Sequence, residues 1–540
     1  MTRVGEDGFP VPKLCGADVE LGAFRRGGTT GRASEDAARD LLREIDGRPA
    51  GDRLFAGAPA SVSPHGYWLP LRQVPSILSA HDPQDWGRKF LTSNGGCVYI
   101  DLGHLELCQP EVLSAFDHVA TWHAMLRIAR RALDAANAGQ PDERRITVLA
   151  NNSDGHGNSF GSHLNFLVTR RTWNNIFEHK LHQLAYLASY QVSAIVFTGQ
   201  GKVGSENGAP PVAYQISQRA DFMESLTGLQ TTYRRPIVNS RDEPLCGSNG
   251  TRRDDRAGDA GLARLHVIFF DSTLCHVASL LKVGVTQIVL AMIEAGQVSP
   301  TLILDDPLEA LHVWSHDPTL RSRARMATGE ALTAVELQRR FLDEAQRFAE
   351  WEGASVAVPR LAEIIALWHD TLCLLETRDL GALASRVDWV LKLAVLQNVL
   401  DARPDLGWDA PAIKHLDHVY SSLEPSEGLY WAFERDERLM KVVSDADIER
   451  FEHEPPADTR AWTRTMLLRR ADGHLVDDVN WDAVRLRTGS RWSGCRTVRL
   501  PNPLAGTSSE MTPRFEAEAT LDGLIDSLQC HEDTSERKPS

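Results

Sequence analysis

Two acidic residues stand two positions apart in the segment 17–21. Asp18 and Glu20 are separated by one valine and flanked by apolar residues, a pattern typical of a β-strand. Side chains at i and i+2 of a strand point to the same face, so the two carboxylates would repel each other. Mg²⁺ between them would relieve this repulsion, because hard cations take oxygen ligands. A solvated strand face is the alternative interpretation.

A second group of reactive side chains follows in the segment 97–106. Tyr99 and Asp101 share one face of an expected strand, and His104 and Glu106 come directly afterwards. An aspartate in such a place can act as a covalent nucleophile or as a base. A turn aspartate with a capping role is the alternative.

The segment 151–163 (NNSDGHGNSFGSH) lies between two expected strands and has an unusual composition. Its three glycines permit positive φ angles and close approach of the backbone to a ligand, so its N–H groups could cradle a phosphate. It is neither a Walker A loop nor a dinucleotide-binding loop, because the Gly-Lys-Ser/Thr ending and the following helix are missing. A plain hairpin loop is the alternative.

Arginine and histidine residues farther along the chain suit the binding of anions or metals. Arg219 lies in a Gln-Arg-Ala-Asp sequence and Arg241 in an Arg-Asp-Glu-Pro sequence, and arginine makes bidentate phosphate contacts. His266, at the start of an apolar strand, is either a ligand or a satisfied core histidine.

The elements that would position these residues form an α+β pattern. Apolar runs predict strands at 98–102, 146–150, 164–169, 194–198 and 265–270. Helical spacing predicts helices over 34–45, 111–137, 173–190, 279–294 and most of 330–400.

The chain divides into a large and a small part. A Pro-Pro pair at 455–456 ends a helix and suggests a catalytic domain over 1–453 and a small C-terminal domain over 454–525. We expect 46–92 to be a long loop that could serve as a lid. We expect 526–540 to be a disordered tail.

The composition excludes several classes of protein. The 540 residues include 58 Lys+Arg and 73 Asp+Glu, a net charge of −15, which disfavours binding to nucleic acid. Eight scattered cysteines without a CxxC pair are typical of a reducing compartment. A signal peptide and an apolar run of about 18 residues are both missing, so a soluble, cytoplasmic protein is expected.

The order of several motifs along residues 14–525 resembles one family, the Pup ligases (PafA) and the Pup deamidase/depupylases (Dop), relatives of glutamine synthetase. The motifs are Asp18 to Gly22, Ser93 to Glu106, Asn151 to His163, Tyr214 to Arg219, Arg241 to Pro244, Arg264 to Ile268, Leu281 to Gly284, Pro455 to Ala461 and Asn480 to Asp482.

The resemblance implies a glutamine-synthetase-like curved antiparallel sheet backed by helices, a small C-terminal domain, and an ATP–Mg²⁺ site on the concave face of the sheet. Asp101 takes the position of the catalytic aspartate. For the nucleotide, ATP or ADP, we expect the binding residues Gln109, Trp481, Arg219, Arg241 and Arg460. For the metal we expect Asp18, Glu20, Tyr99, Glu106, His163 and His266.

The chain also departs from the pattern of this family. Asp18 stands where the family has a glutamate, and Cys97 replaces an arginine that contacts the nucleotide. Leu164 replaces a glutamate, which is expected to remove a carboxylate from the site. Leu245 to Gly247 and Phe270 to Thr273 also differ from the family's motifs.

The resemblance leaves three functions open. Within the family, the ligase forms a γ-glutamyl phosphate that a lysine amine attacks, whereas the depupylase hydrolyses an amide or isopeptide. The long segment 22–95, the Asp101–Glu106 spacing and the segment 458–461 favour the depupylase, whereas 34–45 and 157–159 look more like the ligase. We therefore expect an ATP- and Mg²⁺-dependent amidohydrolase acting on Pup or a Pup-like protein, with a ligase and a non-catalytic Pup- or partner-binding paralogue as alternatives.

Overall fold

An antiparallel sheet forms the centre of the computed structural model, which describes residues 10–28, 32–49, 85–243, 245–246, 261–487 and 494–535. Eight strands take part, in the order β12-β7-β1-β5-β4-β3-β2, and β6 also pairs with β1. The strands are β1 (Cys15–Arg25), β2 (Arg48–Pro49), β3 (Asp85–Phe90), β4 (Cys97–Asp101), β5 (His104–Cys108), β6 (Ile146–Leu149), β7 (Ser162–Thr169) and β12 (Leu262–Val267).

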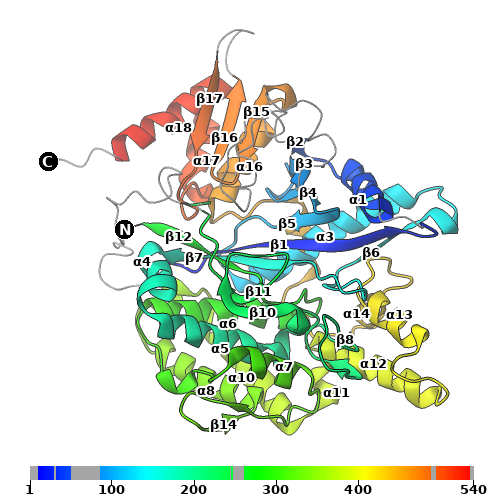
Figure 1. The fold of residues 1–540 in the computed structure, drawn as a ribbon. Coiled ribbons are helices and arrows are strands. Elements are labelled where there is room, and N and C mark those ends of the chain that lie inside the picture. Colours follow the sequence, from blue (N-terminus) through cyan, green and yellow to red (C-terminus); the bar gives the residue numbers. More distant parts are fainter. Residues whose placement is uncertain are drawn as a thin grey trace, which may run out of the picture.

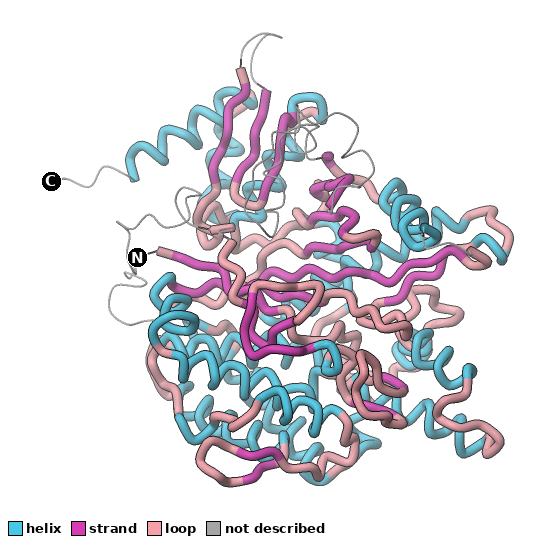
Figure 2. The backbone as a smooth tube through the Cα atoms, viewed as in Figure 1, coloured by secondary structure: helices cyan, strands magenta, loops and turns pink. Residues whose placement is uncertain are grey.

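Helices cover one face of this sheet, and a C-terminal unit lies at the edge formed by β2–β5 (Figures 1 and 2). Ala17, Val19 and Leu21 of β1 are buried against the helices, whereas Asp18 and Glu20 alternate with them and face the other way. The helices before the C-terminal unit are α1 (Arg32–Glu44), α3 (Ala115–Asn137), α4 (Arg170–Asn174), α5 (Leu181–Thr198), α6 (His276–Glu294), α7 (Pro307–Ser315), α8 (Ala334–Ala349), α9 (Ala354–Ala357), α10 (Leu361–Thr377), α11 (Leu380–Leu383), α12 (Asp388–Ala402), α13 (Pro411–Val419), α14 (Leu429–Arg435) and α15 (Asp445–His453).

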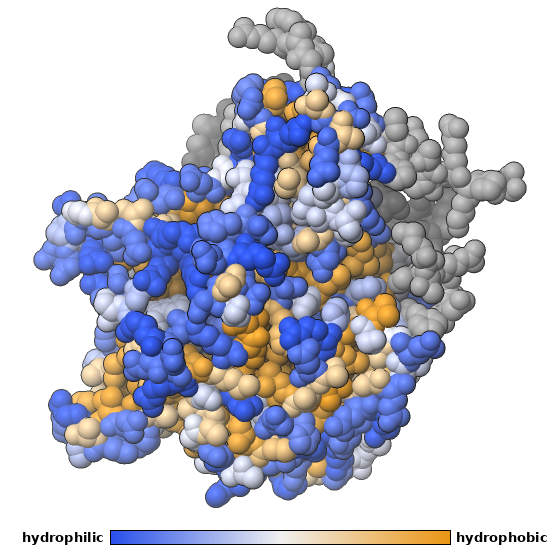
Figure 3. Space-filling view, turned by 180° about the vertical axis from the view of Figure 1, so that it is seen from behind, coloured by the Kyte–Doolittle hydropathy of each residue, from blue (hydrophilic) through white to orange (hydrophobic). Residues whose placement is uncertain are grey.

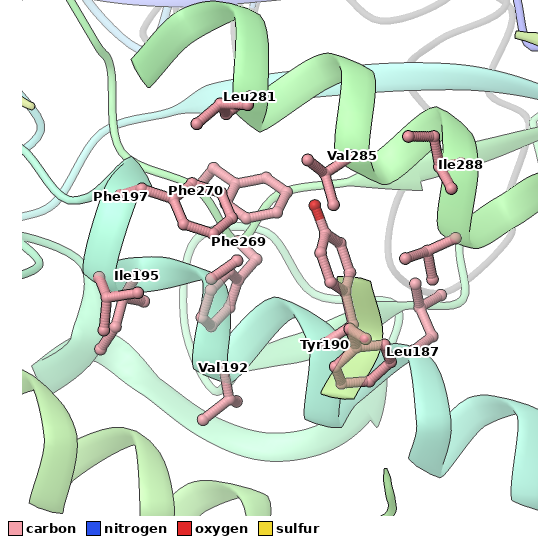
Figure 4. Packing of buried hydrophobic residues seen from close by; sticks show 14 of the residues in the cluster. Leu187, Tyr190, Val192, Ile195, Phe197, Phe269, Phe270, Leu281, Val285 and Ile288 are labelled. Carbon is pink, nitrogen blue, oxygen red and sulfur yellow. The ribbon is translucent and has the colours of Figure 1, made fainter. Parts of the chain in front are cut away.

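The segment 194–198 corrects the sequence-based prediction, because it is the last turn of α5 and not a strand. Figure 4 shows Ile195 and Phe197 of this helix in the same hydrophobic cluster as Phe269 and Phe270. A helix that is buried nearly all round has no polar stripe, so a short apolar run in it cannot be distinguished from a buried strand.

Three short two-stranded pairs in the described part of the chain lie outside the central sheet. They are β8 (Lys202–Val203) with β9 (Tyr214–Gln215), β10 (Met223–Gly228) with β11 (Arg235–Asn239), and β13 (Ala324–Arg325) with β14 (Ala331–Leu332).

Helix α6 is the centre of the helical layer. By length and composition it could cross a membrane, with a mean hydropathy of 1.7, but its apolar window is 100% buried inside the protein. It contacts α3, α5, α8 and α10, which is how a core helix behaves. Seen from behind, hydrophobic residues gather over the lower, helical half of the surface, and the upper part is mainly hydrophilic (Figure 3).

The C-terminal unit packs three strands against its helices. It comprises α16 (Arg460–Arg470), β15 (Val476–Asn480), β16 (Ala483–Arg487), β17 (Cys495–Arg499), α17 (Ser508–Ala517) and α18 (Leu521–Ser535). Helix α18 corrects the prediction of a disordered tail over 526–535, because Leu528 joins Leu524 and Ile525 in one helical stripe that is buried against the unit's core; residues 536–540 lie outside the described residues. The predicted loop 46–92 is also wrong at its two ends, where β2 and β3 pair; its middle lies outside the described residues.

Shortening the chain would test this boundary. We expect a chain that ends at Ser535 to keep its melting temperature, and one that ends at Ile525 to melt earlier. The second truncation removes the buried Leu528, worth about 1.5–3 kcal/mol, and the bond from Gln529 to the carbonyl of Thr497 (3.0 Å). Differential scanning calorimetry of the two truncations and the full chain measures the difference. Equal melting temperatures would show that residues 526–535 add nothing to the fold.

Candidate active site

The polar side chains predicted from the motifs meet on the face of the sheet opposite the helices. Their strands are neighbours, and the register places Tyr99 beside Glu106, Glu106 beside Glu20, and Asp18 beside His163. The alternation of side chains then fixes which residues share the face. From β4 to β12 they are Tyr99, Asp101, His104, Glu106, Asp18, Glu20, His163, Asn165, Arg264 and His266.

Three carboxylates lie closest together on this face. Ligand oxygens of Glu20, Asp101 and Glu106 are all within 4.8 Å of one another. Burial and then the charges of Asp18, Asp101 and Glu20 raise the pKa of Glu106 well above its ordinary value, although a hydrogen bond from Tyr99 opposes the rise. Its Oε2 atom is buried and has no hydrogen-bond partner among the described residues. A divalent cation would satisfy this oxygen and remove the repulsion.

A second group adjoins the first through Asp18. Nδ1 of His163 lies 2.7 Å from Oδ1 of Asp18, and the amide of Asn165 donates to Oδ2 of the same carboxylate at 2.9 Å. Oδ1 of Asn165 in turn lies 2.9 Å from Nδ1 of His266. Burial would raise the pKa of Asp18, but the charge and hydrogen bond of His163 outweigh burial and lower it. The group therefore holds an ionised carboxylate at the centre of the face.

Asn165 is a functional candidate that the sequence argument did not single out. It also accepts a bond from Arg264 at 2.8 Å, so one amide orients an acid, a histidine and an arginine. Its place two residues after His163 on a strand could have indicated the shared face. His104, which stacks on Phe160 with ring centroids 4.9 Å apart and lies 4.0 Å from Glu20, was likewise not assigned a role.

The C-terminal unit meets this face where β3, β4 and β5 end. The ring of Trp481, in the turn between β15 and β16, packs edge-on against Phe90 of β3, with centroids 5.2 Å apart. Gln109 directly follows β5; its backbone N–H donates to Ala17 (2.8 Å), and both atoms of its buried amide are unpartnered within the described residues. Trp481 thus lies at the seam between the C-terminal unit and the sheet, and Gln109 follows the strand that carries Glu106.

Arg460 lies in the same seam but is bound to the chain itself. Its Nε donates to Glu111 at 2.8 Å, and its other nitrogens donate to the carbonyls of Leu500 and Leu245. Arg464, one turn later, donates to both oxygens of Glu111. Arg460 therefore joins the sheet to the C-terminal unit.

Arg219 and Arg241 donate hydrogen bonds to groups of the chain itself. Arg219 is buried, and its guanidinium donates to the carbonyls of Phe160 and Ile268. Arg241 donates to Glu243, which also binds Arg264 and so reaches the Asn165 group. The charge of Glu20 acts on Arg219, and the role of both arginines in nucleotide binding stays a prediction.

Leu164 corrects an expectation about the site. Its side chain lies in the helix-side hydrophobic cluster and is 1% exposed, opposite Ala17 and Val267 in the register. His163 and Asn165 on either side face the carboxylates. A leucine at position 164 therefore removes no carboxylate from the site of this chain.

The glycine-rich loop before β7 is closed on itself. Oδ1 of Asp154 accepts from the N–H groups of His156 and Asn158, and Glu206 accepts from that of Gly157. An antiparallel bridge joins Ser153 to Ser159. The chain's own carboxylates accept from these amides, which contradicts the phosphate cradle. The plain hairpin is also wrong, because the flanking strands β6 and β7 pair with successive parts of β1 and not with each other.

Comparison with known proteins decides the family. The model of the family described as Pup-ligase protein matches residues 70–485. The chain belongs to this Pup-ligase family. A depupylase from Acidothermus cellulolyticus is 35% identical over 426 residues, covering 78% of this chain and 79% of that protein. A Pup–protein ligase from Acidimicrobium ferrooxidans is 33% identical over 427 residues, covering 78% and 88%.

Two solved structures of Pup ligases share the fold of this family member. The complex of Pup with its ligase PafA matches with a TM-score of 0.72 and 24% identity, over 96% of this chain and 93% of that one. PafA in complex with ADP matches with a TM-score of 0.67 and 26% identity, over 85% and 93%. The predicted α+β fold, an antiparallel sheet backed by helices, is confirmed.

Proposed function

We propose that the protein is an ATP- and Mg²⁺-dependent amidohydrolase that removes Pup or a Pup-like protein from an amide or isopeptide bond. The clustering of Glu20, Asp101 and Glu106 carries the proposal, because it supplies both a cation site and a base on one buried face. Similar proteins named depupylase and Pup deamidase/depupylase, 35% and 33% identical, support hydrolysis of a Pup-linked bond.

The residues of the site fit both expected cofactors. Glu20 and Glu106, with Asp18 and Tyr99 beside them, would hold Mg²⁺, because the unpartnered oxygen of Glu106 is the kind of ligand that it takes. Bound Mg²⁺ would polarise the carbonyl to be attacked. The unpartnered amide of Gln109 fits the hydrogen-bonding groups of a nucleotide. PafA, 26% identical, is solved with ADP, which supports a nucleotide here.

Asp101 is the residue to which we assign proton transfer. As a base it would take a proton from water while the water oxygen bonds to the amide carbonyl carbon. The C–N bond then breaks, its electron pair stays on nitrogen, and Asp101 returns the proton to the departing amine. Tyr99, buried beside Glu106, stays a neutral phenol, because burial and then the charge of Glu106 raise its pKa well above the ordinary value.

Amide formation is the second candidate, because Pup–protein ligases are nearly as similar as the depupylases, at 33% identity. One assay separates them: purified protein with MgATP and either a Pup–lysine conjugate, or free Pup and a lysine-bearing protein. We expect release of Pup from the conjugate without ADP formed in proportion. Conjugate formation coupled to ADP release would replace the proposal by the ligase, and inactivity in both would favour the binding-only paralogue.

The cofactor site predicts a change in thermal stability. We expect MgATP to raise the melting temperature of the wild-type protein, since a ligand at 100 times its dissociation constant adds about 2.7 kcal/mol. Asp18→Ala should abolish this shift, because it removes the carboxylate that His163 and Asn165 orient. Differential scanning fluorimetry measures both. A wild type that does not respond to millimolar MgATP would contradict the proposed cofactor.

A further inference from the structure

A β-bulge re-aims one cation of β3 toward the candidate site. The register of β3 and β4 shifts between Trp86 and Lys89, and Gly87 in this interval has a φ of +70°. A Cβ atom at Gly87 would lie 2.6 Å from Leu42, so glycine meets both the backbone and the packing requirement. Bulges of this kind redirect a neighbouring side chain.

Arg88 is the side chain that this bulge turns onto the sheet face of the carboxylates. Its guanidinium carbon lies 4.3 Å from the centroid of the Tyr99 ring, and Tyr99 is the register partner of Glu106. Lys89 points the opposite way and donates to the carbonyls of Leu42 and Ile45. The cation–π contact places the charge of Arg88 beside Tyr99, the neighbour of Glu106.

The strand that carries Arg88 also contacts the C-terminal unit. Phe90, two residues further on β3, packs against Trp481. The charge of Arg88 also acts on Asp478 of β15, where it opposes a rise in pKa that is due first to burial. Arg88 therefore lies over Tyr99, on the strand whose Phe90 packs against Trp481.

We propose that Arg88 binds the phosphate chain of the nucleotide between the metal site and the C-terminal unit. The inference rests on the proposed nucleotide site and assigns a residue of this chain to it. A guanidinium suits this place, because phosphate oxygens accept two parallel N–H bonds from its planar fork. Tyr99 would hold the guanidinium in place by stacking, so that little side-chain entropy is lost on binding.

Isothermal titration calorimetry on full-length variants tests the assignment. We expect Arg88→Ala to weaken MgADP and MgATP binding about ten- to hundredfold, the loss of a charged contact, and Arg88→Lys to recover part of it. Binding of adenosine, which has no phosphate, should not change. Arg340→Ala is the matched control, because Arg340 is an exposed arginine on α8 paired with Glu330. The melting temperature of each variant without ligand reports whether it folds.

The outcomes separate this inference from the proposed function. If the wild type binds neither nucleotide at millimolar concentration, the proposed nucleotide site itself fails. If the wild type binds and a folded Arg88→Ala variant binds equally well, the assignment of Arg88 is overturned and the proposed function stands. An equal loss of adenosine and ADP binding would also overturn it, since Arg88 would then shape the pocket without contacting phosphate.

Discussion

Replacing Asp101 by asparagine is expected to reduce turnover of a Pup conjugate by roughly a thousandfold or more. The amide keeps the shape of the side chain but can neither attack a carbonyl nor accept a proton from water, and loss of such a group typically costs two to four orders of magnitude. Asp101 lies in the carboxylate cluster with Glu20 and Glu106. Because asparagine has the same shape, we expect these two neighbours to stay in place. Single-turnover cleavage of a purified conjugate measures the effect.

Two further measurements define the role of Asp101. Asp370→Asn is the matched control, because Asp370 is an exposed carboxylate on α10, and this variant should keep full activity. The stabilisation by MgATP should persist in Asp101→Asn if Glu20 and Glu106 hold the metal. Loss of both the activity and this stabilisation would assign Asp101 to metal binding, and unchanged turnover would reject both roles.

Arg464→Met is expected to destabilise the protein by about 3–5 kcal/mol, the largest effect on stability that we predict. Arg464 is fully buried and donates to both oxygens of Glu111, at 3.1 and 2.7 Å, as well as to the carbonyls of Trp481 and Gly95. Removing one partner of a buried pair leaves the other charge uncompensated. Urea unfolding of the variant and the wild type measures the difference.

The same substitution in an exposed pair is the control. Arg340 bonds Glu330 at 2.8 and 2.6 Å on the surface, and Arg340→Met should cost less than about 1 kcal/mol. Equal effects of the two substitutions would show that the buried pair contributes no more to the free energy of unfolding than the exposed pair. A large effect of Arg464→Met alone would identify this ion cluster as what joins the C-terminal unit to the sheet.

Acid should weaken this junction in a defined range. Burial would raise the pKa of Glu111, but Arg464 and Arg460 outweigh burial and lower it from 4.5 to about 2. The resulting stability, about 3 kcal/mol, is complete above the ordinary pKa and is lost as the pH falls toward 2. Urea unfolding from pH 6 to 2 should show this loss in the wild type and a smaller one in Glu111→Gln. Parallel pH profiles of stability for the wild type and Glu111→Gln would contradict this prediction.

Local patterns along the chain were sufficient for much of the site. Alternation alone indicated that Asp18 and Glu20 share a face, and likewise Tyr99 and Asp101, because side chains on a strand repeat every two residues. The same rule, applied to Leu164, would have placed it with the core. Local patterns failed at 194–198, where a short apolar run lies in a helix buried nearly all round, and at α18, whose polar composition hides a narrow apolar stripe.

The sequence by itself determined the α+β class, the family resemblance and the candidate carboxylates, because each depends on residue types at short spacing. Only the tertiary structure decided which of these groups meet. Strand order and register bring β4, β5 and β1 together so that Glu20, Asp101 and Glu106 converge from three strands, and a bulge turns Arg88 onto their face. Pairing between strands depends on contacts between residues far apart in the chain, which no local pattern encodes.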